Sequence, residues 1–169
     1  MDTELAIASK RDRREYADEP IPPDVERRIL EAGWVAGSAR NRQDRRFVVL
    51  REGREAATEL VTRPDNLRQA KLVVAILIPE DRPAAPFDAG RAAQNMMLAA
   101  WNHGVVSCPN AIAEPEELNE LAGAADDERV GIVLSFGLSG SGADPARFSA
   151  EEWVEKADRV PFEQAVTRA

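Results

Sequence analysis

The sequence predicts one mixed α+β domain that covers residues 1–169. Two near-continuous apolar runs, at 72–78 and 131–136, are typical of buried strands, and segments with helical periodicity lie around them. Neither internal repeats nor low-complexity tracts interrupt the chain. A composition of 44% hydrophobic and 31% charged residues is ordinary for a globular protein, and 169 residues are enough for one core.

The shorter helices are expected where apolar residues recur at helical spacing. One covers residues 2–10, and others cover residues 55–63 and 115–121. A further helix follows Pro22 and Pro23, because proline suits a first helical turn. Its expected buried stripe consists of Val25, Ile29, Ala32, Gly33 and Ala36.

The longest expected helix, residues 89–103, is apolar nearly all round and is therefore expected at the centre of the structure. Asp88 is its expected N-cap and Gly104 its expected C′ residue. From Gly137 onward the chain is rich in Gly, Ser and Asp. Strands are expected from β-branched and aromatic residues at 46–51, 72–78, 105–108 and 131–136.

The charge and the rare residue types exclude several classes of function. A net charge of −8 argues against nucleic acid or an anionic membrane surface as the main partner. The N-terminus lacks the apolar core of a signal peptide, and no apolar run approaches the roughly 20 residues of a membrane span, so a cytoplasmic protein is expected. A single cysteine, Cys108, and a single histidine, His103, leave no disulfide framework and no metal site. Cys108 has no basic cluster near it in sequence and is expected to be structural rather than a nucleophile.

A basic segment follows the first expected helix. Lys10, Arg11, Arg13 and Arg14 place four cations within five residues of an acidic protein. Such a cluster suits a phosphate monoester, because Arg and Lys give charge-assisted hydrogen bonds to it. The alternative is a solvated helix end, where positive charge suits the helix dipole.

A polar loop, residues 38–43, follows the second expected helix. Its Ser38, Asn41 and Gln43 carry hydroxyl and amide groups that suit the donor and acceptor edge of a heterocycle. The alternative is a plain polar connection after a helix end. The sequence contains no P-loop and no GxGxxG after a strand, so neither of these phosphate-binding devices is expected.

Five segments, taken in order, resemble the FMN-dependent nitroreductase family. The family shows a basic Arg-Arg-Ser-x-Arg-x-Phe/Tyr start, a Pro-Ser-x-x-Asn-x-Gln loop, an Asp-x-Gly-x-x-x-Gln-Asn helix and an Arg-x-Pro tail. Each motif alone is weak, but together they span nearly the whole chain in register. The matching segments are AIASKRDRREY with Pro20-Ile21-Pro22, ILEAGWVAGSARNRQ with RFVVL, DAGRAAQNMMLAAWNHGVVSC, VGIVLSFG, and Arg159-Val160-Pro161-Phe162-Glu163.

The resemblance implies a homodimer of α+β subunits, each with a mostly antiparallel central sheet flanked by helices, and FMN bound at the subunit interface. Lys10 and Arg11 match positions that reach the FMN phosphate and ribityl chain, and Arg159 joins them from the tail. Arg14 matches a basic residue near the flavin pyrimidine, where positive charge stabilises reduced FMN.

The resemblance also assigns cofactor positions to the polar loop and to the end of the strand at 105–108. Asn41 matches the amide that pairs with the pyrimidine edge, and Gln43 belongs to the same motif. Ser38 and Ala39 match positions that approach the flavin from the partner subunit. The segment Cys108-Pro109-Asn110-Ala111 matches the one whose backbone faces flavin N5.

Asp12 stands where the family usually has Ser, and it either orients Arg14 or Arg11 or weakens flavin binding. Gly37 and Asp44 each replace a usual Pro. The connections before Lys71 and after Ile78 are short, which leaves little chain for the helices that shape the substrate pocket in larger members.

The implied activity is hydride transfer from a reduced nicotinamide nucleotide, NADH or NADPH, to nitroaromatic or quinone-type acceptors by a ping-pong route. FMN carries the chemistry, and no catalytic side chain is assigned. Two alternatives are a flavin- or deazaflavin-binding protein of the same fold without nitroreductase activity, and the same fold with a site that no longer binds flavin.

Overall fold

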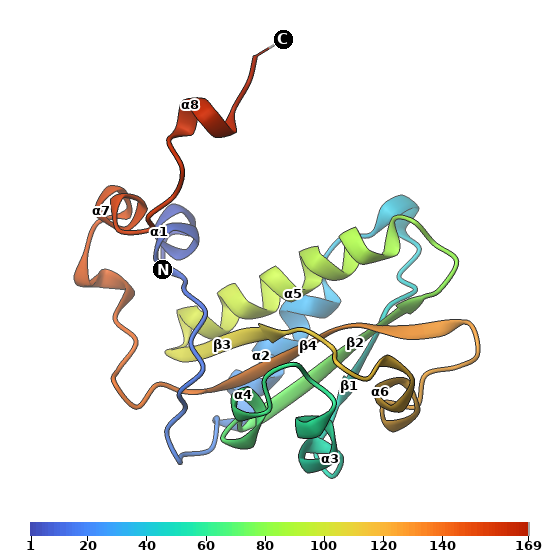
Figure 1. Cartoon of the computed structure of the whole chain (residues 1–169). Coiled ribbons are helices and arrows are strands. Elements are labelled where there is room, and N and C mark those ends of the chain that lie inside the picture. Colours follow the sequence, from blue (N-terminus) through green and yellow to red (C-terminus); the bar gives the residue numbers. More distant parts are fainter. Residues whose placement is uncertain (169) are drawn as a thin grey trace. The chain divides into compact units, whose positions relative to one another are not determined.

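The computed structural model describes residues 1–168. Two compact units divide the chain: a central unit, Arg11–Ala143, and a terminal unit made of residues 1–10 together with those from 144 onward. Figure 1 traces both units along the sequence. The single domain over residues 1–169 stays a prediction.

The central unit is built on a four-stranded sheet (Figure 1). Every pair of neighbouring strands is antiparallel, which confirms the expected α+β class and its sheet. Within residues 1–168 the parallel pairing is limited to an isolated bridge between Asp12 and Ser107. The strand order is β1-β2-β4-β3, where β1 is Arg46–Val49, β2 is Leu72–Pro79, β3 is Val105–Asn110 and β4 is Glu128–Leu138.

Strand β2 is covered by helices on both faces, so it is apolar at every position. Alternate side chains of a strand point to opposite faces. Leu72, Val74, Ile76 and Ile78 belong to one core cluster, with α2 (Pro23–Trp34) and α5 (Ala85–Asn102). Val73, Ala75 and Leu77 belong to the other, with residues of α3 (Arg54–Glu59), α4 (Asp65–Arg68) and α6 (Pro115–Leu121) or adjoining them.

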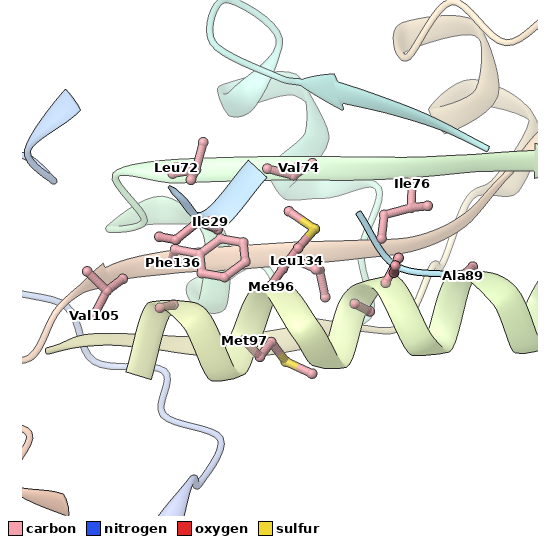
Figure 2. Close-up of a cluster of buried hydrophobic side chains, with 14 of the residues drawn as sticks. Ile29, Leu72, Val74, Ile76, Ala89, Met96, Met97, Val105, Leu134 and Phe136 are labelled. Atoms are coloured by element: carbon pink, nitrogen blue, oxygen red, sulfur yellow. The ribbon is translucent and has the colours of Figure 1, made fainter. Parts of the chain in front are cut away.

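Helix α5 forms one wall of the first cluster, as Figure 2 shows. Met96 is fully buried and packs in the same cluster as Leu134 and Phe136. Helix α2 crosses α5 at Gly33, where a Cβ atom would lie 2.7 Å from Met96 Cγ and 2.9 Å from Phe47 Cε1. The close approach of the two helices therefore requires a residue without a side chain at position 33.

The start of α5 differs from the expectation. The helix begins at Ala85 rather than Ala89, because Pro86 suits its first turn. Asp88 is therefore not the N-cap but lies within the first turn, buried, and Ala84 takes the cap position without a side-chain bond. Gly104, with a φ of 74°, confirms the expected left-handed residue that ends the helix.

Other boundaries shift by a few residues. The helix expected at 55–63 ends at Glu59, and Pro64 then opens the separate helix α4. Strand β3 continues through Pro109, which is tolerated because β3 is an edge strand. Helix α2 ends at Trp34, so Ala36 of the expected stripe lies beyond it, although it is buried.

Residues 1–10 and 144–168 of the terminal unit form four short helices. Helix α1 (Thr3–Ser9) confirms the first expected helix, and the Asp2 carboxylate caps it. The sequence did not indicate the other three: η2 (Pro145–Arg147), α7 (Ala150–Glu155) and α8 (Phe162–Ala165). Ser149 and Glu152 form a capping box at α7. Within residues 1–168 every helix is too short or too polar to cross a membrane.

Candidate functional site

The basic segment, as far as it lies in the central unit, is extended and docked on β3. The amide of Arg13 donates to the carbonyl of Ser107 at 3.1 Å, next to the Asp12–Ser107 bridge. Neighbouring side chains of an extended segment point to opposite sides. Arg14 contacts Cys108, whereas Arg13 Nη1 donates to Ser141 Oγ at 3.2 Å. Arg13 and Arg14 thus have different neighbours, and both lie in an extended segment beyond the end of α1.

Arg14 lies near Cys108 of β3. The pKa of Arg14 is raised, first by the neighbouring Cys108 side chain, and the nearby Asp12 carboxylate raises that pKa further. Cys108 itself is 1% exposed, and its Sγ donates to the carbonyl of Pro109 at 3.2 Å. The sequence placed no cation near Cys108, so this neighbour appears only in the structure. A permanent positive charge therefore lies beside the segment 108–111.

The side chain of Asn110 is bound entirely by the protein. Asn110 is 3% exposed, and its Nδ2 donates to the Cys108 carbonyl and to Ser135 Oγ, both at 3.0 Å. Its Oδ1 accepts from Asn66 Nδ2, also at 3.0 Å. The Ser135 hydroxyl shares a 2.8 Å hydrogen bond with the hydroxyl of Tyr16. Of this residue, only the backbone is left to face a ligand.

Sequence reasoning did not identify Asn66, Ser135 or the role of Tyr16. Asn66 lies in α4, a helix that the sequence did not indicate, and its partner is 44 residues away. Tyr16 and Ser135 are 119 residues apart. The four polar groups of Tyr16, Ser135, Asn110 and Asn66 form one buried chain under the end of β3.

A pocket of about 830 Å³ lies beside Arg14 and Tyr16. Residues 12–16 line it together with Gln69 and the turn Ser139–Ser141. The two arginines of its lining, Arg13 and Arg14, are balanced by Asp12 and Glu15, so its formal charge is zero. The pocket therefore suits a polar, hydrogen-bonding ligand surface better than a dianion.

The polar loop 38–43 has an unusual backbone. Arg40, Asn41 and Gln43 all have φ between 53° and 56°, the left-handed region that favours glycine. For L-residues this conformation costs roughly 1–2 kcal/mol each, with Asn at the low end. Ser38 Oγ accepts from the amide of Gln43 at 3.0 Å and closes the loop. The side chains of Asn41 and Gln43 are exposed.

One charged residue outside the loop binds its backbone, and a second binds the two residues just before it. The Asp88 carboxylate accepts from the amide of Ala39, with Oδ1 at 3.2 Å and Oδ2 at 3.0 Å. Arg45 donates to the carbonyls of Ala36 and Gly37, just beyond the end of α2, where a cation suits the helix dipole. Burial lowers the pKa of Arg45, although nearby Asp88 opposes this. Neither contact could be expected from sequence spacing.

Lys10 and Arg159 belong to the terminal unit. Lys10 follows α1 as its C-cap residue. Arg159 follows α7, and its Nη1 donates to the carbonyl of Ala157 at 3.0 Å. Their joint role with half-buried Arg11 stays a prediction. In the part of the chain that the structure describes, no three His, Cys, Asp or Glu side chains are grouped to hold a metal ion.

Comparison with known proteins decides the family. A model described as the Nitroreductase family matches residues 7–76 and 57–138. The chain belongs to the nitroreductase family. The matched range contains the basic segment from Lys10, the polar loop 38–43 and the segment 108–111, whereas Arg159 lies outside it.

Individual relatives extend the likeness beyond that range. A protein of Archaeoglobus fulgidus, provisionally named an NADH dehydrogenase/NAD(P)H nitroreductase, is 27% identical over 87% of this chain and 96% of its own. A nitroreductase family protein of Clostridium difficile shares the fold with a TM-score of 0.81, at 20% identity over 99% of this chain and 98% of its own. A provisionally named nitroreductase of Desulfovibrio desulfuricans, in complex with FMN, shares the fold with a TM-score of 0.78. It is 24% identical over 100% of this chain and 98% of its own.

Tyr16 predicts a defined pH dependence of stability. Burial raises the pKa of its hydroxyl well above the ordinary value, since the Ser135 bond opposes this only in part. The folded state thus keeps Tyr16 protonated while the unfolded state ionises it above about pH 10. Its stabilising contribution is complete below that pH, and we expect it to fall by about 1.4 kcal/mol per pH unit above it.

Denaturant titrations between pH 9 and pH 11 give the free energy of unfolding of the wild type and of Tyr16→Phe. The excess stability of the wild type over the variant is expected to fall as the pH rises. Lysine titration is common to both proteins and cancels. Because Tyr16 is the single tyrosine, tyrosinate absorbance reports it directly. Ionisation near pH 10 in protein that is still folded would contradict the prediction.

Proposed function

We propose that the chain is an FMN-dependent oxidoreductase. Membership of the nitroreductase family and the FMN complex of the Desulfovibrio desulfuricans relative support this cofactor. The observation that carries the proposal is Arg14, a permanent and exposed cation near Cys108 of β3 and the Asp12 carboxylate, in the lining of the 830 Å³ pocket. In this proposal the cofactor supplies the redox chemistry, by which hydride from reduced nicotinamide passes to nitroaromatic or quinone-type acceptors in a ping-pong route.

The donor set of the central unit fits a flavin ring. Arg14 provides positive charge for the pyrimidine edge, where negative charge accumulates on reduction. The buried chain from Tyr16 to Asn66 keeps the backbone of residues 108–111 in one position, which suits a fixed contact with N5. No side-chain acid or base is assigned, and the chain's own part is to bind, orient and exclude water.

The phosphate requires other cations, because the pocket beside Arg14 is formally neutral. We assign it to Lys10, Arg11 and Arg159, on the resemblance alone. Asp12 contributes by orienting Arg14, since its carboxylate is close enough to raise the pKa of that guanidinium.

Turnover tests the proposed reaction. With FMN bound, the protein is expected to oxidise NADH or NADPH with a quinone acceptor, and to give parallel double-reciprocal plots when both substrates are varied. Free FMN without protein is the control. Tight FMN binding without nicotinamide oxidation would instead favour the alternative, a flavin- or deazaflavin-binding protein without this activity.

We further propose a homodimer in which Ser38 and Ala39 approach the flavin of the partner subunit, while Asn41, in the same motif as Gln43, pairs with a pyrimidine edge. The middle of α5 gives no reason for a dimer, because it buries Met96, Met97 and Trp101 within its own chain. Large apolar side chains are exposed instead at the end of α2 and in the first turn of α5: Trp34 is 72%, Val35 70% and Phe87 70% exposed. Obligate interfaces of this kind bury on the order of 2,000–5,000 Å². A flavin-loaded monomer in sedimentation at micromolar concentration would refute the homodimer.

The phosphate assignment predicts a ligand-specific loss of affinity. Charge-assisted hydrogen bonds contribute about 1.5–3 kcal/mol each. Arg11→Ala or Arg159→Ala is therefore expected to weaken FMN binding by roughly 10- to 150-fold in a fluorescence titration. Riboflavin lacks the phosphate, so it is expected to bind the wild type poorly. Its affinity is expected to fall little further in either variant.

Arg28→Ala is the matched control, since it removes an exposed arginine of α2 and changes the net charge equally. It should leave both affinities nearly unchanged. Equal losses for FMN and riboflavin in the Arg11 and Arg159 variants would mean that these residues do not bind the phosphate.

A further inference from the structure

The polar loop 38–43 needs support from outside itself. Three of its residues have left-handed backbone without being glycine. Such a conformation persists only where the surrounding structure imposes it. The side chains of Asn41 and Gln43 are exposed, so they supply little packing that could do so.

Asp88 supplies a rigid attachment. It is 3% exposed and lies in the first turn of α5, the helix that forms one wall of the core. Both of its carboxylate oxygens accept from the Ala39 amide, at 3.0 and 3.2 Å. Because Ala39 directly precedes the first left-handed residue, this contact determines where the unusual backbone begins.

Arg82 ties the other end of the loop to the same carboxylate. Its Nη2 lies 2.9 Å from Asp88 Oδ2, and its Nη1 pairs with Asp44, the residue after Gln43. Arg82 thus connects the two ends of the loop through one guanidinium. Its side chain is 14% exposed, so water screens these ion pairs less than surface pairs.

Two more arginines complete the cluster. Arg91 Nη1 lies 3.8 Å from Asp88 Oδ1, and its guanidinium lies beside Gly37. Arg45 binds the carbonyls of Ala36 and Gly37. Three cations and two carboxylates surround the loop, and Asp88 is the carboxylate that binds its backbone directly.

We propose that Asp88 is a positioning residue for the cofactor site. Its carboxylate, neutralised by Arg82 and Arg91, holds the polar loop 38–43 in the conformation that directs Asn41 and Gln43 toward the flavin. The part that concerns flavin rests on the proposed function, but the part that concerns the loop does not. Asp88 acts through Ala39 and has no contact with the ligand in this account.

Limited proteolysis measures the loop without any ligand. Trypsin cleaves after arginine, and Arg40 and Arg42 are exposed within the loop. Asp88→Asn preserves the size of the side chain but removes the charge that pairs with the arginines. We expect cleavage after Arg40 and Arg42 to accelerate about tenfold or more, the size of effect that the loss of one charge-assisted hydrogen bond gives. Mass spectrometry of the fragments identifies the bonds.

The control is Glu128→Gln. It weakens another ion pair, between Glu128 of β4 and Arg46 of β1 at 2.6 Å, in which neither residue contacts Asp88 or Ala39. Any general loss of stability appears in both variants, whereas loop-specific cleavage is expected only in Asp88→Asn. If Asp88→Asn does not fold, Arg82→Gln is the second variant, because it removes the ion pair that neutralises Asp88 and releases Asp44 at the end of the loop, so faster cleavage after Arg40 and Arg42 is again expected.

FMN titration is the second readout. An affinity reduced about tenfold or more in Asp88→Asn but not in Glu128→Gln, together with the specific cleavage, supports the proposal. Unchanged cleavage after Arg40 and Arg42 overturns it, and so does faster cleavage with unchanged FMN affinity. Wild-type protein that binds no FMN refutes the proposed function, while the cleavage comparison still reports whether Asp88 holds the loop.

Discussion

The burial of α5 against the sheet is the constraint on which both halves of the candidate site depend. Met96 fills the space between α5, α2 and the central strands, and Gly33 allows the two helices to approach. The first turn of α5 carries Asp88, which binds the polar loop. Its last turn ends at Gly104, which redirects the chain into β3 and so toward Cys108 and Asn110. One helix therefore sets the positions of two segments that are far apart in sequence.

The two segments use charge in different ways. Around Asp88 the charges are largely buried and bind backbone groups, so they determine the conformation of the polar loop. Their contribution to the stability of that conformation is largest when every partner is present. Arg14 is exposed near Cys108 and Asp12, so its charge is available to a ligand. In the proposed function, the buried ion cluster shapes the loop and the exposed cation meets the flavin.

The sequence predicted the elements whose signal is local. The apolar runs at 72–78 and 131–136 are strands because both faces of β2 are covered and β4 lies beside it. Gly104 ends its helix as its residue type indicates.

Asp88 was misassigned as a cap because Asp before an apolar stretch is typical of caps, whereas its true partner, Ala39, is 49 residues away. The left-handed residues Arg40 and Gln43 carry no local signal, because neither residue type favours that backbone. The buried chain from Tyr16 to Asn66 depends on contacts across 44 and 119 residues, which no spacing rule anticipates.

The central claim, that this chain binds FMN, is tested most directly by the visible absorption spectrum of the purified protein before and after FMN is added. The account predicts flavin bands that shift on binding and saturate at one FMN per chain, with the excess flavin removed by gel filtration and the bound flavin retained. A protein that elutes without flavin, and leaves the spectrum of added FMN unchanged, would contradict it.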